Sequence, residues 1–72
     1  MNLPDPTHAP ALLILRGEEL PVPAPITLGD ALAQVEVHPE TVLAVREGVL
    51  VHTNDWLQPG DRVRLVGVIS GG

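Results

Sequence analysis

The stretch Leu57-Gln-Pro-Gly-Asp-Arg-Val-Arg-Leu-Val-Gly-Val-Ile-Ser-Gly-Gly72 decides the fold of this chain. Its first part, Gln58-Pro-Gly-Asp61, predicts a type II turn, with Pro at the second position and Gly at the third. Residues 62–68 are mostly apolar and predict the last β-strand. Gly71 and Gly72 follow as a thin strip of backbone that can enter a channel too narrow for any Cβ atom.

Four further segments before this stretch predict strands. Residues 11–16 are almost continuously apolar, which is typical of a central strand. Residues 19–24 contain two prolines, which confine a strand to the edge of a sheet because Pro cannot donate a ladder hydrogen bond. Residues 42–46 and 49–52 predict two more strands, and the turn at 54–57 is expected to offer Trp56 and Leu57 to the core.

One helix is predicted, at residues 27–36. Thr27 is a good N-cap, and Asp30 follows it at the spacing of a capping-box variant. Apolar side chains at Leu28, Ala31, Leu32 and Val35 recur at helical spacing and form one apolar face. The helix is expected to stop at His38, because the proline that follows disfavours helical geometry there.

The predicted order is of the ββαββ type, with two strands before the helix and the strands at 42–46, 49–52 and 62–68 after it. One helix covers one face of a small mixed sheet. The fold class is therefore α+β, and the folded domain is predicted at residues 11–68. Residues 1–10 are polar and rich in proline and predict a disordered N-terminal tail. Residues 69–72 predict a flexible C-terminal Gly-Gly tail that carries the free carboxylate.

The composition excludes several classes of function. The chain of 72 residues has a net charge of -5, with four arginines and no lysine, which argues against direct nucleic-acid binding. It has no cysteine, so it offers no disulfide, thiolate metal ligand or thiol nucleophile. The histidines are isolated, and the carboxylate pairs Asp55 with Asp61 and Glu18 with Glu19 lie in turns. No metal site and no catalytic site are therefore expected.

The hydropathy of the chain bears on its location. No apolar stretch reaches the about 20 residues needed to span a bilayer, so no membrane segment is expected. The N-terminus lacks a basic region and is broken by Pro4, Pro6 and Pro10, so no signal peptide is predicted. A cytoplasmic protein is the resulting expectation.

Alternation along the strands predicts a mixed apolar and basic surface near the tail. If Arg16, Arg46 and Arg64 face away from the helix, the side chains toward the helix are Leu13, Leu15, Leu43, Val45, Val63 and Leu65. The predicted docking patch for a partner protein then consists of Val42, Ala44, Arg46, Arg64, Val66, Val68, Ile69 and Ser70. An ordinary half-exposed sheet face is the alternative interpretation.

Residues 11–72 resemble the ThiS/MoaD sulfur-carrier family, which has the ubiquitin-like β-grasp fold. Val42-Leu-Ala-Val-Arg46 is similar to its VAV strand, Leu57-Gln-Pro-Gly-Asp61 to its L-x-x-G-D turn, and Val66-Gly-Val-Ile-Ser-Gly-Gly72 to its diglycine ending. The stretch Pro39-Glu-Thr-Val-Leu-Ala-Val-Arg46 is especially similar to TtuB-like carriers, and Trp56 is more like the ThiS-like carriers. The absence of Phe and Tyr disfavours the MoaD branch and its molybdopterin role.

This resemblance implies a sulfur carrier, which is a cosubstrate and not an enzyme. An E1-like enzyme would adenylate Gly72 with ATP and Mg²⁺, while Gly71 keeps the carbonyl group sterically open. A sulfur donor such as a cysteine desulfurase or a rhodanese would then convert the adenylate to a thiocarboxylate. A downstream enzyme would accept the sulfur for tRNA 2-thiouridine or thiamin thiazole synthesis. The chain itself is expected to bind no cofactor.

Two functions of other classes stay open at this point. The first is a ubiquitin-like modifier that is joined through Gly72 to lysines of target proteins, which uses the same activated carboxyl group. The second is a non-covalent β-grasp binding module, for which the tail would be dispensable.

Overall fold

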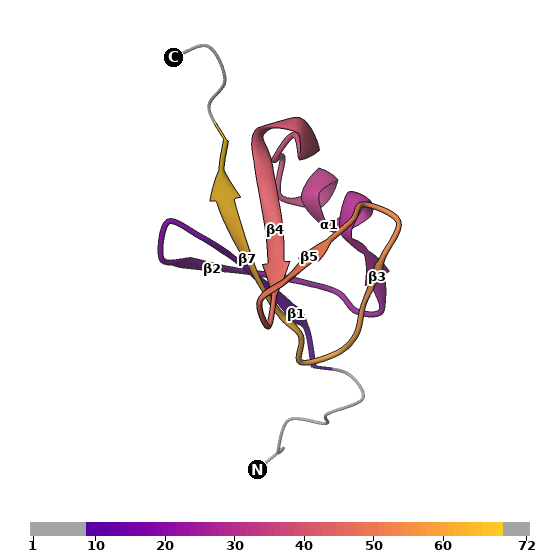
Figure 1. Cartoon of the computed structure of the whole chain (residues 1–72). Coiled ribbons are helices and arrows are strands. Elements are labelled where there is room, and N and C mark those ends of the chain that lie inside the picture. The colour runs from indigo at the N-terminus through magenta and orange to yellow at the C-terminus, as the bar shows by residue number, and fades with distance from the viewer. Residues whose placement is uncertain (1–8, 69–72) are drawn as a thin grey trace.

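A five-stranded mixed sheet forms one layer of the molecule, and one α-helix packs across it (Figure 1). The computed structural model describes residues 9–68. β1 and β7 are parallel neighbours in the middle of the sheet, and the other adjacent pairs are antiparallel. The spatial order of the strands is β2 (Glu18–Val22), β1 (Ala11–Leu15), β7 (Arg62–Gly67), β4 (Val42–Arg46) and β5 (Val49–Val51).

Two short strands, β3 (Ile26–Thr27) and β6 (Trp56–Leu57), form a separate antiparallel ribbon beside the sheet. The sequence pattern did not predict them as strands, because elements of two residues show no period. With these two short strands included, the observed order of elements is three strands, then the helix, then four strands. The central position of β1 and the edge position of β2 are confirmed.

Helix α1 (Leu28–Gln34) begins as predicted, because the Thr27 hydroxyl accepts a hydrogen bond from the Asp30 N–H at 3.2 Å. It ends before residue 36. Glu36 has a φ of +59°, and the Val37 N–H donates to the Leu32 carbonyl at 2.9 Å. With the bond from the Glu36 N–H to the carbonyl of residue 33, this is a Schellman ending formed without glycine.

The tight turns hold their register through residues with positive φ. Arg16 and Gly17 have φ values of +53° and +82°, and Glu47 and Gly48 have +52° and +79°. Two consecutive positive φ values are the mark of type I′ hairpin turns. The predicted turn before β7 is confirmed, because Gly60 has a φ of +86° and the N–H of residue 61 donates to the carbonyl of residue 58 at 3.0 Å.

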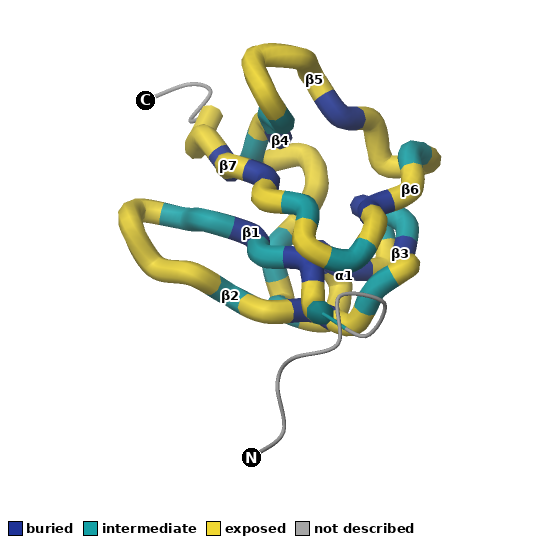
Figure 2. Tube along the Cα trace, turned by 90° about the horizontal axis from the view of Figure 1, so that it is seen from below, coloured by how far each residue is buried: buried dark blue, intermediate teal, exposed yellow. Residues whose placement is uncertain are grey.

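The core lies between the sheet and α1, and every buried residue of the described chain is an aliphatic one. Figure 2 shows these residues on the strands and on α1, while the hairpin turns stay exposed. A short 3-10 turn, η1 (Pro39–Thr41), contributes no buried residue and connects the helix region to β4. The buried set is Ala11, Leu13, Val22, Ile26, Leu28, Ala31, Leu32, Ala44, Val51, Leu57, Val63 and Leu65.

The expectation that Trp56 joins Leu57 in the core is wrong for the tryptophan. Leu57 is fully buried, whereas 57% of Trp56 is exposed. The two residues are consecutive in β6, where they pair with Ile26 and Thr27. Successive side chains of a strand point to opposite faces, so only one of the two can enter the core.

This difference predicts unequal losses of stability for two neighbouring substitutions. Leu57→Ala should lower the free energy of unfolding by about 2–5 kcal/mol, because it leaves a cavity in the core. Trp56→Ala should lower it by about 1 kcal/mol or less. Urea unfolding followed by far-ultraviolet circular dichroism measures both, and Leu57→Val serves if the alanine variant does not fold. Equal losses at the two positions would contradict this account of β6.

Candidate functional site

The end of β7 is the part of the described structure nearest to the predicted reactive group. Val68 follows β7, and its N–H donates to the Thr41 carbonyl at 2.8 Å. This bond carries the pairing of β7 with the β4 side of the sheet one residue further. The predicted reactive residues Gly71 and Gly72, and the patch residues Ile69 and Ser70, lie outside the described residues. The candidate site is therefore the surface that surrounds the end of β7.

The sheet face turned away from α1 presents apolar side chains from three adjacent strands. The cross-strand pairs Leu43 with Val66 and Val45 with Arg64 place these side chains on one face, and Val45 also pairs with Leu50 of β5. Leu43, Leu50 and Val66 are among the exposed large hydrophobic residues. We call this surface the outer-face patch, which consists of Leu43, Val45, Leu50, Arg64 and Val66.

The predicted docking patch is wrong for the residues of β4. Ala44 is only 4% exposed and pairs with the buried residues Leu65 and Val51, so it faces the helix. Val42 and Arg46 share its side of the strand. Leu43 and Val45, which were expected to face the helix, lie on the outer face instead.

The error came from Arg46, which was assumed to point into solvent on the open face. Its guanidinium instead donates to an Asp61 carboxylate oxygen at 2.8 Å and to the Trp56 carbonyl at 3.2 Å. In β7 the sequence assignment holds, since Arg64, Val66 and Val68 are exposed and Val63 and Leu65 are buried.

The turn before β7 is joined to β4 and to the start of β1 through Asp61. One of its carboxylate oxygens accepts from Arg46 and also from the Gln58 N–H at 2.8 Å. Its carbonyl accepts from the Leu12 N–H at 2.8 Å, and the Gly60 N–H donates to the Pro10 carbonyl at 3.1 Å. Asp61 therefore holds the start of β1, the end of β4 and the turn together, which is a structural role.

Asp55 also has a local role, because its carboxylate accepts from the His52 N–H at 2.9 Å. Asp55 and Asp61 thus each close a turn. Within residues 9–68, no three His, Asp or Glu side chains are grouped closely enough to hold a metal ion. No helix of that part of the chain has the length and apolar character needed to cross a membrane.

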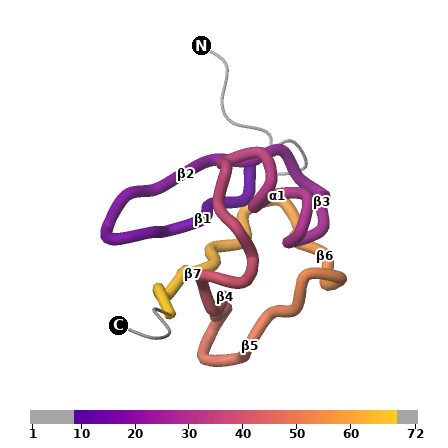
Figure 3. The backbone as a smooth tube through the Cα atoms, turned by 90° about the horizontal axis from the view of Figure 1, so that it is seen from above, coloured from indigo at the N-terminus to yellow at the C-terminus, as the bar shows by residue number. Residues whose placement is uncertain are grey.

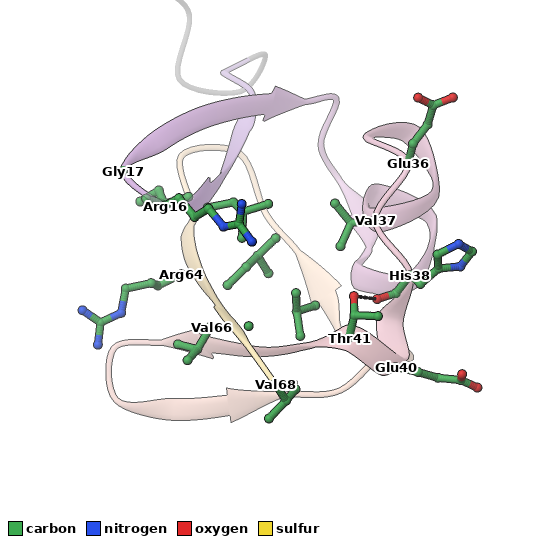
Figure 4. A pocket seen from close by; sticks show the side chains of 15 residues that line it. Arg16, Gly17, Glu36, Val37, His38, Glu40, Thr41, Arg64, Val66 and Val68 are labelled. Atoms are coloured by element: carbon green, nitrogen blue, oxygen red, sulfur yellow. Dashed lines mark hydrogen bonds between the residues drawn. The ribbon is translucent and has the colours of Figure 1, made fainter. Parts of the chain in front are cut away.

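A groove that the sequence did not predict opens on the other side of the end of β7 (Figure 4). It has a volume of about 980 Å³ and lies between the β1–β2 turn, the connection from α1 to β4, and β7. Gly67 and Val68 line it from β7, and Arg16 lines it from the hairpin turn. No sequence motif indicates this groove, because its walls come from segments distant along the chain.

Comparisons with known proteins agree with this architecture. The model of the ThiS family matches residues 11–72. Among solved structures, the chain is similar to Caldiarchaeum subterraneum ubiquitin, with a TM-score of 0.64 and 20% sequence identity over 90% of this chain and 99% of the other. At this identity the likeness shows the fold, which confirms the expected α+β, ubiquitin-like β-grasp. A search of curated proteins gave no match.

The corrected assignment of faces predicts opposite results for two adjacent substitutions. Ala44→Asp should lower the free energy of unfolding by about 3 kcal/mol or more, because it buries a carboxylate without a partner. Leu43→Asp should leave the fold intact, since 46% of Leu43 is already exposed. Thermal and urea unfolding of the two variants measure this, and a stable Ala44→Asp protein would restore the original assignment.

Proposed function

Because this chain belongs to the ThiS family over residues 11–72, we propose that it is a sulfur carrier activated at Gly72. Members of this family are small carrier proteins that interact with an E1-like activating enzyme and with sulfur-accepting partners. The observation that carries the proposal is that the family match runs through the diglycine, Gly71 and Gly72. In the proposed reaction the chain supplies the carboxyl group, and its partners supply the catalytic groups.

The proposed chemistry has three steps. The Gly72 carboxylate attacks the α-phosphorus of ATP in the activating enzyme, and pyrophosphate leaves as the acyl adenylate forms. A persulfide sulfur of the donor, such as a cysteine desulfurase or a rhodanese, attacks the acyl carbon and displaces AMP. A second thiol then reduces the acyl disulfide, which yields the thiocarboxylate and a disulfide. Mg²⁺ and basic groups of the activating enzyme offset the phosphate charge.

The outer-face patch is the docking surface that we propose for the activating enzyme. Its centre is apolar, with Leu43, Leu50 and Val66 exposed, and Arg64 adds a positive charge. Exposed apolar side chains grouped on one face are typical of protein interfaces. A protein bound here would contact β7 directly, so it would fix the direction in which the strand delivers the following residues.

Two pathways are proposed for the sulfur. The stretch Pro39-Glu-Thr-Val-Leu-Ala-Val-Arg46 supports tRNA 2-thiouridine synthesis, and Trp56 supports thiamin thiazole synthesis. The absence of Phe and Tyr weighs against molybdopterin synthesis. Conjugation of Gly72 to lysines of target proteins starts from the same adenylate, so it is an alternative outcome of the first test below.

The intact mass of untagged protein from its native host tests the thiocarboxylate. We expect a species heavier by the difference between sulfur and oxygen, which reacts with a thiol alkylating agent although the chain has no cysteine. Deletion of Gly72 should abolish this species and leave the unfolding curve unchanged. Full sulfur transfer after the deletion would exclude the proposal, and isopeptide-linked conjugates without any sulfur-containing species would favour the modifier.

A second test concerns the outer-face patch. Leu43→Asp or Val66→Asp should raise the KM of adenylation by about tenfold or more, because a buried apolar contact would be replaced by a charge. Val49→Asp is the matched control, since Val49 is 67% exposed but lies on the other side of its strand. Pyrophosphate release with the purified activating enzyme measures the effect. An equal effect at all three positions would exclude specific docking on this face.

A further inference from the structure

The groove beside the end of β7 has an open strand edge along it. β1 pairs with β7 up to Leu15 and Leu65 and then turns away at Arg16. β7 continues through Gly67, where its described partner is Val42 on the β4 side. The backbone of residues 66–67 therefore has no strand beside it on the β1 side within the described residues. An extended peptide can pair with such an edge through main-chain hydrogen bonds.

Gly67 leaves room for an incoming side chain in the groove. It follows the alternation of Val63 and Leu65, so a Cβ atom at this position would point to the helix side. Such a Cβ atom would meet no other atom within 4 Å. The surrounding wall is apolar, because Val37 and Val42 are partly buried there and line the same groove. This space fits one bulky apolar side chain.

The charges around the groove are arranged asymmetrically. Figure 4 shows the Arg16 guanidinium turned toward the groove, whereas the carboxylates of Glu36 and Glu40 point away on the opposite wall. Arg46 and Arg62 form ion pairs elsewhere, each at 2.8 Å. Arg64 borders the groove with its guanidinium turned away from it, so Arg16 is the arginine that faces the groove (Figure 4). A single carboxylate fits at the Arg16 end, and a second one near the glutamates would be repelled.

We propose that this groove binds an extended segment of a partner protein. The segment places one bulky apolar side chain over Gly67 and one carboxylate at Arg16, and it pairs with the open edge of β7. This site goes beyond the docking of the activating enzyme, because the space over Gly67 lies on the helix side of β7, whereas Leu43 and Leu50 of the outer-face patch lie on the opposite side. Arg64 and Val66 border both surfaces. Two partners can therefore hold the same strand from its two faces.

Nuclear magnetic resonance with the 15N-labelled full chain tests this site, and it requires no activating enzyme. The probe is a blocked pentapeptide with one aspartate next to a leucine, set in threonines that favour an extended chain. We expect saturable shifts of the backbone amides of Arg16, Val37 and Gly67. The same peptide with asparagine in place of aspartate should bind about tenfold more weakly, because it loses a charge-assisted hydrogen bond.

Two variants with a matched control complete the test. Gly67→Val should weaken binding of the aspartate peptide by more than about tenfold while the fold is kept, because a β-branched residue suits a strand and fills the groove. Arg16→Gln should reduce affinity to that of the asparagine peptide. Arg62→Gln, on the same strand as Gly67, should change nothing.

The opposite results would overturn the proposal. These are the absence of any shift, shifts confined to Leu43 and Leu50, or unchanged binding by both the Gly67→Val and Arg16→Gln proteins. Formation of the thiocarboxylate is scored separately, by intact mass. The groove can therefore fail while the sulfur carrier stands, and the carrier can fail while the peptide still binds.

Discussion

The parallel pairing of β1 with β7 is the constraint on which the rest of this structure depends. The strands come from opposite ends of the described chain, and β7 then pairs with β4 on its other side. Leu13 and Val63, which face each other in this pairing, are both fully buried. Without β7 the β1–β2 hairpin and the β4–β5 hairpin would have no common sheet, as the arrangement of the tube in Figure 3 makes clear.

The position of β7 also explains why the functional surfaces gather around one strand. Its buried residues, Val63 and Leu65, hold the core, and its exposed residues join the outer-face patch. Near Gly67 the strand extends beyond the end of β1, and this difference in length opens the groove on the helix side. The turn at Asp61 fixes the other end of β7 to the start of β1 and the end of β4. The strand is therefore held firmly where it enters the sheet and is accessible from both faces where it leaves it.

The sequence predicted the elements with strong local signals. The N-cap at Thr27, the turn around Gly60 and the edge strand with Pro21 have specific chemistry at fixed positions, and each is confirmed. The face of β4 could not be predicted from the apolar pattern, because Val42, Leu43, Ala44 and Val45 are all apolar and only Arg46 distinguishes the two faces. The arginine was used to set the phase, and its side chain instead reaches across to Asp61, which is distant in the sequence.

The groove escaped prediction for a related reason. It forms where β1 ends two residues short of the end of β7, and strand ends are not fixed by the apolar pattern. Gly67 has no distinguishing sequence signal within its strand, and its open surroundings depend on the path of the α1–β4 connection. The local sequence thus predicted the fold. The candidate sites could not be predicted in the same way, because they depend on tertiary contacts between segments that are distant in the sequence.

The aliphatic core has a consequence for spectroscopy. The chain has one tryptophan and no tyrosine or phenylalanine, and that tryptophan is exposed on the β3–β6 ribbon. Its fluorescence emission therefore reports on solvent and quenchers at the surface near Arg46. The aliphatic core contributes no fluorescence and no near-ultraviolet absorption. Partners that bind at the end of β7 can carry aromatic groups of their own. The near-ultraviolet absorption and fluorescence of those groups would overlap only with the signal of Trp56.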